Sequence, residues 1–228
     1  SHELRTPLNS IIGFSDSLLS GTQGDITDKN QREYLSNILN AGSHLLELIN
    51  DILDLSRIES GRMALEETDV DIAELVANVL RLTFEQSTSK GIQIIDRIDP
   101  DMPHVRADKR QIRQVLLNLL SNAMKFTSSG GRIRITVGIK HNGDVAIAIR
   151  DNGVGIAPDD LMRVQQPFIQ VADSQTRKHQ GTGLGLAIVK SIVEQHGGEF
   201  GLESTLGHGT VARFTLPAKR LIKESGGT

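Results

Sequence analysis

The sequence contains no cysteine and no long apolar run in its 228 residues. The lack of cysteine excludes disulfides, thiolate catalysis and cysteine-ligated zinc, and it fits a reducing cytosol. No apolar stretch approaches the roughly 20 residues that span a bilayer, and no secretory signal opens the chain. An excess of one charge is also missing, because 25 basic residues are balanced by 28 acidic ones. This balance disfavours general binding to nucleic acid or to a membrane surface.

Residues 1 to about 60 show only a helical pattern. Apolar or small residues recur every three or four positions in two segments, at Leu4, Leu8, Ile11, Ser15 and Leu18, and at Leu35, Ile38, Gly42, Leu45, Ile49 and Ile52. The stretch SGTQGDITDKN between them predicts a break. A helical hairpin cannot bury so wide an apolar face alone, so we expect a symmetric dimer that forms a four-helix bundle. The pattern starts without a helix cap, and we expect an upstream part to be missing.

After the charged link RIESGRMALEE the pattern changes to a mixture of helices and strands. Helices are predicted over 71–91, 108–126 and 185–197, and Asp108 is the expected N-cap of the second. Strands are predicted over 92–96, 132–139, 144–151, 199–205 and 210–217, with a turn at HNG between the second and third. We expect an α+β sandwich with one helical layer on a mostly antiparallel sheet. The predicted domains are 1–62 and 69–220.

Polar side chains lie along one face of the predicted helix 108–126. Asn118 and Asn122 are four residues apart, Gln114 is one turn earlier, and Lys125 follows Asn122 by three. Amide oxygens and a cation suit a hydrated Mg²⁺ and phosphate oxygens, because Mg²⁺ takes oxygen ligands and keeps several waters. The alternative is a solvated helix face, although asparagine is a poor helix former.

The motif DNGVGI directly follows a predicted strand. Gly153 and Gly155 would let the backbone approach a flat ligand closely, and the Asp151 carboxylate can accept from an exocyclic amine. A plain turn is the alternative interpretation.

The motif GTGLGL directly precedes a predicted helix. Its glycines can aim backbone N–H groups and a helix N-terminus at anionic phosphates. It matches neither the P-loop nor the dinucleotide-binding fingerprint. The polar segment PFIQVADSQTRKHQ before it has the composition of a lid, from which Arg177 and Lys178 could reach a γ-phosphate. A disordered loop is the alternative.

The order of these motifs resembles that of the GHKL superfamily, which includes gyrase, a heat-shock chaperone, mismatch-repair ATPases and sensor histidine kinases. The asparagine helix, DNGVGI, the lid segment, GTGLGL and GHGT follow one another over residues 69 to 218. The resemblance implies an ATP-binding domain in which Asn122 ligates Mg²⁺, while Asn118 and Lys125 contact phosphate. Asp151 would recognise the adenine amino group, and Phe126 would pack near the adenine or in the core. The pocket and lid hinge would be shaped by Gly153, Gly155, Gly181, Thr182, Gly183, Leu184 and Gly185.

The opening SHELRTPL matches a second motif, H-E-x-x-[TN]-P-L, at His2, Glu3, Thr6, Pro7 and Leu8. Within the superfamily, only the histidine kinases carry it on an upstream helical hairpin. The whole sequence therefore resembles the dimerisation, phosphotransfer and catalytic core of a two-component sensor histidine kinase. The one departure is the missing helix before His2, where family members connect to a sensor or transmission module.

Elementary chemistry separates the roles of three catalytic candidates, His2, Glu3 and Thr6. Neutral imidazole is a usable nucleophile near pH 7 if its other nitrogen loses a proton, which the adjacent Glu3 can accept. The Thr6 hydroxyl, one turn on, can bind a water, and the resemblance assigns it to dephosphorylation of the partner regulator. Pro7 lacks an N–H and is expected to kink the helix. An exposed helical histidine is the alternative for His2.

The resemblance implies ATP-dependent autophosphorylation of His2, transfer to an aspartate of a response-regulator receiver domain, and phosphatase activity on that regulator. The expected cofactors are ATP and Mg²⁺, and the expected state is a cytoplasmic homodimer without nucleic-acid or membrane contact in this sequence. Membrane anchoring through an upstream region stays open. The alternatives are a non-catalytic scaffold, which intact His2, Glu3 and Asn122 disfavour, and a gyrase-type clamp, which lacks its coupled domain here. The remaining histidines are expected at the surface: His44, His104, His141, His179, His196 and His208.

Overall fold

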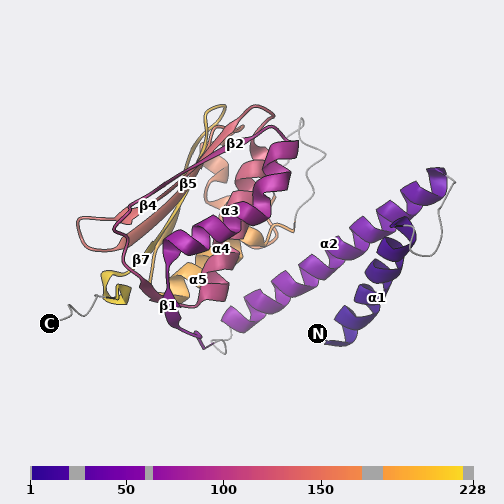
Figure 1. Cartoon of the computed structure of the whole chain (residues 1–228), viewed down its shortest axis with the longest axis horizontal. Helices are drawn as coiled ribbons and strands as arrows, with labels where there is room; N and C mark the ends of the chain where they lie inside the picture. The colour runs from indigo at the N-terminus through magenta and orange to yellow at the C-terminus, as the bar shows by residue number, and fades with distance from the viewer. Residues whose placement is uncertain (1, 21–28, 60–63, 171–181, 223–228) are drawn as a thin grey trace. The chain divides into compact units, whose positions relative to one another are not determined.

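A computed structural model describes residues 2–20, 29–59, 64–170 and 182–222 (Figure 1). The side chains of residues 2–7 lie outside the described part. The chain divides into two compact units, residues 1–57 and 58–228, and each is considered by itself. No helix in the described ranges is long and apolar enough to cross a bilayer. The predicted domain bounds, 1–62 and 69–220, stay a prediction.

The first unit consists of helices α1 (His2–Leu19) and α2 (Lys29–Glu59), which confirms the two predicted helices. On α1, Leu8 and Ser15 are buried, as the seam spacing predicts. Phe14 stays exposed in the single chain, and so do other residues of the two predicted apolar faces: Ile11, Leu18, Ile38, Leu45 and Ile52. The single chain therefore buries only part of the apolar surface of its hairpin.

The second unit is a layer of three helices on one five-stranded sheet (Figure 1). The helices are α3 (Ile72–Ser89), α4 (Lys109–Phe126) and α5 (Gly185–Gln195). The strand order is β2-β4-β5-β7-β6, with β2 (Gln93–Ile98), β4 (Arg132–Ile139), β5 (Val145–Asp151), β6 (Phe200–Thr205) and β7 (Gly209–Leu216). Only the β2–β4 pair is parallel in this sheet. The predicted α+β architecture is confirmed.

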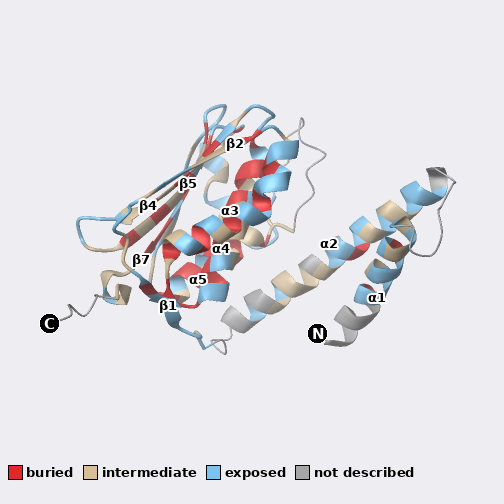
Figure 2. Ribbon diagram, in the orientation of Figure 1, coloured by how far each residue is buried: buried red, intermediate tan, exposed pale blue. Residues whose placement is uncertain are grey.

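Buried and less buried residues alternate along the central strands, so one face of the sheet packs against the helices. Every second residue of β4 and β5 is buried, from Ile133 to Val137 and from Val145 to Ile149, and Figure 2 shows buried residues concentrated where helices and sheet meet. The Asp108 carboxylate accepts the N–H groups of Arg110 (3.0 Å) and Gln111 (3.1 Å). Asp108 is therefore the N-cap of α4, as predicted.

Two short strands were not predicted. β1 (Thr68–Val70) and β3 (Val105–Ala107) pair with each other in a separate antiparallel ribbon. Short 3₁₀ turns also occur at Pro158–Asp160, Arg163–Gln165 and Ala218–Arg220. The last of these turns follows β7 directly.

The predicted surface position of His196 is wrong. Its side chain is fully buried at the C-terminal end of α5, where apolar residues of that helix meet the core. The exposed positions of His104, His141 and His208 are confirmed. His44 and His179 lie outside the described side chains. Burial of an imidazole requires hydrogen-bond partners, and His196 has two, Asp108 and Ile192.

Candidate functional site

The polar face of α4 lies at the border between core and solvent. Gln114, Asn118, Asn122 and Lys125 are half-buried. The apolar residues between them, Leu116, Leu119, Leu120, Ala123 and Met124, are buried. One face of this helix therefore carries amides and a cation at the protein surface, while its other side packs in the core.

The helix α5 begins beside that polar face. The Nδ2 of Asn118 lies 3.5 Å from the carbonyl oxygen of Gly185, the first residue of α5, a long hydrogen bond. Among the described residues, no side-chain hydrogen bond caps this helix at Leu184, whose own N–H donates to the Thr182 hydroxyl (3.1 Å). An uncapped helix N-terminus directs N–H groups and a partial positive charge outward, which favours an anion. The structure thus places Asn118, on the polar face of α4, next to Gly185 of the GTGLGL motif.

Asp151 is the last residue of β5, and it is only 8% exposed. Its Oδ1 accepts the backbone N–H of Gly153 (2.8 Å) and of Thr210 (3.2 Å). Burial raises the pKa of Asp151, and these backbone hydrogen bonds oppose the shift. Because both donors contact Oδ1, the second oxygen keeps its capacity to accept from a ligand amine.

Two glycines let the chain after Asp151 pass between neighbouring segments. A Cβ on Gly153 would lie 2.3 Å from the carbonyl oxygen of Phe126, and Gly155, at φ +71°, would place one 2.1 Å from that of Thr205. No larger residue fits either position without a shift of the backbone. The N–H of Val154 donates to the Phe126 carbonyl (3.2 Å), so DNGVGI is fastened to the end of α4.

Phe126 and Lys125 close that end of the helix. Phe126 is 40% exposed, which excludes the alternative of a core position. The Lys125 Nζ lies 5.1 Å from the ring centroid, within cation–π range. Both side chains are therefore at the surface next to the DNGVGI loop.

Two residues of the site received no role from the sequence. Thr210 belongs to the noticed GHGT motif, and its N–H orients Asp151. Ser204 on β6 accepts the N–H of Ile156 (2.8 Å) and lies 2.8 Å from the hydroxyl of Thr210. The GHGT motif could have identified Thr210 as a site residue from the sequence. No local pattern marks Ser204, because its role depends on the pairing of β6 with β7.

Several predicted site residues cannot be compared with this geometry. His2, Glu3 and Thr6 lie in the first turns of α1, but their side chains are outside the described part. Arg177, Lys178 and Gly181 also lie outside the described residues. Within the described ranges, no group of three or more His, Cys, Asp or Glu side chains could hold a metal ion. An Mg²⁺ held by the Asn122 amide and by waters needs no such group, so the predicted donor fits the ion.

Family models match both units of the chain. One described as "Histidine kinase-, DNA gyrase B-, and HSP90-like ATPase" matches residues 107–220, which contain the α4 stripe, Asp151 and α5. Another, "His Kinase A (phospho-acceptor) domain", matches residues 1–61, which contain His2. The chain belongs to the sensor histidine kinase family. Among curated relatives, this kinase is 43% identical to the histidine protein kinase DivJ of Caulobacter vibrioides, over 95% of this chain and 36% of DivJ.

Solved structures show the same similarity. Full-length ShkA in complex with AMPPNP aligns with this histidine kinase at a TM-score of 0.78 and 34% identity, over 95% of this chain and 44% of ShkA. ThkA in complex with the response regulator protein TrrA aligns at a TM-score of 0.67 and 28% identity, over 95% of this chain and 59% of ThkA. The chain spans about two fifths or less of the curated relatives that it matches.

Proposed function

We propose that this chain is a kinase core that transfers the γ-phosphoryl group of ATP to His2 and then to an aspartate of a response-regulator receiver domain. The observation that carries the proposal is the pairing, in one chain, of a phospho-acceptor match that includes His2 with an ATPase match that includes the described site. The phosphotransfer domain is assigned to residues 1–62 and the ATP-binding domain to 69–220. A cytoplasmic location is part of the proposal.

Each part of the described site suits one part of the nucleotide. The free oxygen of Asp151 would accept from the adenine amino group, and the backbone at Gly153 and Gly155 would lie against the base. The phosphates would meet Asn118 and the N-terminus of α5. The AMPPNP complex of ShkA supports a nucleotide in a fold of this kind. Lys125, Arg177 and Lys178 are assigned to the phosphates, and Gly181, Thr182, Gly183 and Leu184 to the surrounding loop.

Asn122 would hold Mg²⁺ through its amide oxygen. Bound Mg²⁺ neutralises charge on the phosphates during phosphoryl transfer. The remaining work of the chain is positioning, because phosphoryl transfer needs little covalent help from the protein.

The transfer step follows from the chemistry of imidazole. One ring nitrogen of His2 attacks the γ-phosphorus, the bond from that phosphorus to the bridging oxygen breaks, and ADP leaves. The proton on the other ring nitrogen passes to the carboxylate of Glu3. The resulting phosphoramidate then loses its phosphoryl group to the receiver aspartate. Thr6 would orient a water that hydrolyses the aspartyl phosphate, which gives the core its phosphatase activity.

The partners proposed are a second copy of this chain and a response regulator. On the hairpin, Phe14 is 73% exposed and Leu45 is 50% exposed, and a second hairpin would cover such side chains in a four-helix bundle. The complex of ThkA with TrrA supports a regulator as the phosphoryl acceptor.

The test is incubation with ATP labelled at its γ-phosphorus. We expect a label on the protein that acid removes and base does not, as for a phosphoramidate, and His2→Gln should abolish it without loss of AMPPNP binding. His141→Gln, at an exposed position in the β4–β5 turn, is the matched control and should label normally. Label that survives His2→Gln, or that resists acid, contradicts the assignment.

A further inference from the structure

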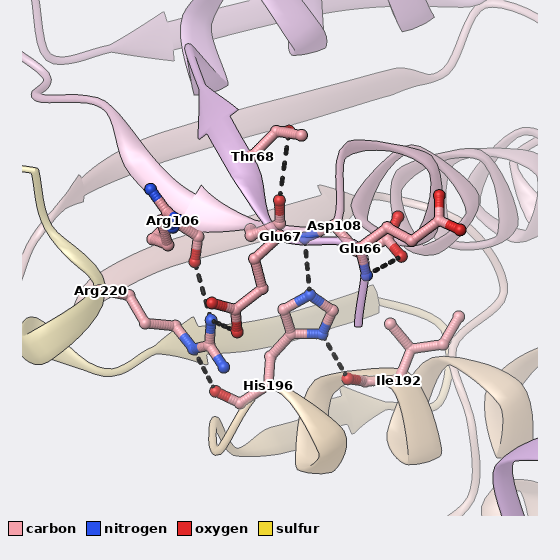
Figure 3. Close-up of polar contacts among 9 residues, drawn as sticks. Glu66, Glu67, Thr68, Arg106, Asp108, Ile192, His196 and Arg220 are labelled. Carbon is pink, nitrogen blue, oxygen red and sulfur yellow. Dashed lines mark hydrogen bonds and ion pairs between the residues drawn. The ribbon is translucent and has the colours of Figure 1, made fainter. Parts of the chain in front are cut away.

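A polar network holds Glu66 and Glu67, the two residues directly before β1 (Figure 3). Its members come from the segment before β1, from β3, from the start of α4, from the end of α5 and from the last 3₁₀ turn. We call it the linker anchor, and it consists of Glu66, Glu67, Arg106, Asp108, His196 and Arg220.

Arg220 joins three segments with one guanidinium group. Its Nη1 donates to the Glu67 carboxylate (2.7 Å) and to the Arg106 carbonyl (2.8 Å), and its Nε donates to the His196 carbonyl. The Arg220 side chain is only 12% exposed. Because the guanidinium group is planar and donates several hydrogen bonds, it fixes the directions of these bonds as well as their lengths. The ammonium group of a lysine would not fix their directions.

Asp108 connects the segment before β1 to helix α4. Its Oδ1 caps α4, while its Oδ2 accepts the backbone N–H of Glu66 (3.2 Å). Its own N–H donates to the buried ring of His196 (3.1 Å). One residue therefore starts the helix that carries Asn118 and Asn122 and also holds the chain that arrives from the hairpin.

The network is separate from the residues assigned to ATP. None of its six members belongs to that set, and β1 is held independently by its ladder with β3. Loss of the Arg220–Glu67 contact should therefore loosen the segment before β1, where the Glu66 N–H still binds Asp108, without changing the residues assigned to ATP. What would change is how firmly the direction of the chain is fixed where it leaves the catalytic unit.

We propose that the linker anchor sets the approach of the nucleotide to the phospho-acceptor, with Arg220 as a positioning residue for the transfer to His2. The inference rests on the proposed function. If the connecting chain leaves the catalytic unit in a fixed direction, it limits the positions which that unit can take relative to the hairpin. If the direction is not fixed, the unit samples many more positions, and few of them allow transfer. Transfer between two tethered groups is sensitive to such misplacement even when each group is intact.

The experiment compares Arg220→Gln and Glu67→Gln in the full chain with the matched control Arg213→Gln. Arg213 forms a more exposed ion pair with Glu203 (3.0 Å) across β6 and β7, and neither residue belongs to the linker anchor. Initial rates of label on His2 are measured over a range of ATP concentrations and divided by the number of AMPPNP-binding molecules. This division corrects the rates for protein molecules that are unfolded and cannot bind the nucleotide.

We expect kcat to fall about 10-fold in Arg220→Gln, with a smaller loss in Glu67→Gln, because small misplacements of reacting groups cost this much or more. The KM for ATP and the Kd for AMPPNP should stay within about 2-fold in both variants, and Arg213→Gln should match the unmodified protein. Unchanged kcat in both anchor variants, or equal changes in kcat and KM, overturns the inference while the proposed function stands. Absence of label in the unmodified protein overturns both.

Discussion

The backbone N–H of Asp108 donates to the Nε2 of His196 across 3.1 Å, although 88 positions separate the two residues in the chain. Because Nε2 accepts this bond, it carries no proton, and the ring is the neutral tautomer that donates from Nδ1 to the Ile192 carbonyl (2.8 Å). If Nε2 were protonated, its N–H would face the N–H of Asp108 at the start of α4, and neither donor would have an acceptor there. Burial of the ring agrees with this, since it lowers the pKa of His196.

The first prediction concerns pH. The folded state keeps His196 neutral at pH values where the unfolded chain, with a pKa of about 6.5, takes up a proton. The unfolded state then binds more protons, so stability should fall as the pH drops below about 6.5, with a slope of at most about 1.4 kcal/mol per pH unit from this group. Among the charged groups around the ring, Asp108 and Glu67 favour the protonated form and Arg220 opposes it.

Calorimetry between pH 8 and pH 5 measures this effect on the unfolding transition that AMPPNP shifts upward, which identifies the catalytic unit. His196→Gln should lower stability at pH 7.5 by about 1–3 kcal/mol, because a flexible amide cannot reproduce both hydrogen bonds that the ring makes with Asp108 and Ile192. It should also flatten the loss of stability on acidification. His208→Gln, at an exposed position, should keep the slope. The same slope in His196→Gln as in the unmodified protein would contradict the prediction.

The second prediction tests the base contact of Asp151. In Asp151→Asn the amide oxygen can keep the hydrogen bonds from Gly153 and Thr210, which turns the amide N–H₂ toward the adenine amino group. Two donors then oppose each other, and ATP affinity should fall about 10- to 100-fold, by the cost of unpaired polar groups. Inosine triphosphate, whose base presents a carbonyl there, should lose much less affinity.

The stability of this variant provides its control. Burial raises the pKa of Asp151, so its negative charge is less favourable in the folded protein than in the unfolded chain. An uncharged amide of the same shape should therefore leave the unfolding midpoint unchanged or raise it. Equal losses of affinity for ATP and inosine triphosphate would show that Asp151 does not read the amino group.

Local signals predicted most of the fold, and long-range contacts were missed. Repeats of three and four residues identified the helices, and alternation identified β4 and β5, because both reflect contacts of neighbouring residues. β1 and β3 have three residues each, which is too short for alternation to show. The parallel pairing of β2 with β4 depends on a crossover through β3 and α4, and no local pattern specifies it.

At the site, too, local motifs were found in the sequence and long-range contacts were missed. The spacing of Asn118 and Asn122 and the glycines around Asp151 indicated a ligand because each motif is contiguous. His196 was misplaced because it follows α5 as a single polar residue, and its partner Asp108 lies on another helix. Ser204 was missed for the same reason, since its contacts cross from β6 to the DNGVGI loop.

The third prediction concerns the α4 stripe. Asn122→Asp adds a charge beside the phosphates and changes the donor offered to Mg²⁺, so kcat for label on His2 should fall at least about 10-fold. The hairpin should remain folded and dimer-competent, which sedimentation can verify. EDTA should stop labelling in the unmodified protein. Full activity in Asn122→Asp would mean that this stripe is only a helix surface.

The last prediction separates two activities on α1. Thr6 cannot take a proton from imidazole near pH 7, and its hydroxyl can only orient another group, such as a water that attacks the aspartyl phosphate of the regulator. Alanine also has a higher helix propensity than threonine, so Thr6→Ala should not unfold the hairpin. We expect Thr6→Ala to keep most autophosphorylation of His2 and to slow dephosphorylation of the regulator. Glu3→Ala should instead lose autophosphorylation, because the imidazole proton has no acceptor.

Two assays on each variant decide between these outcomes: the label on His2 over time, and the decay of regulator phosphate in the presence of ADP. A dimerisation measurement accompanies both, because residues on one helix of a bundle can also act through assembly. A variant that dimerises normally but loses one activity has lost a chemical role. Equal loss of both activities in Thr6→Ala would mean that the two residues do not divide the work, and Thr6 would then belong to the architecture of the helix rather than to the hydrolysis of the regulator's phosphate.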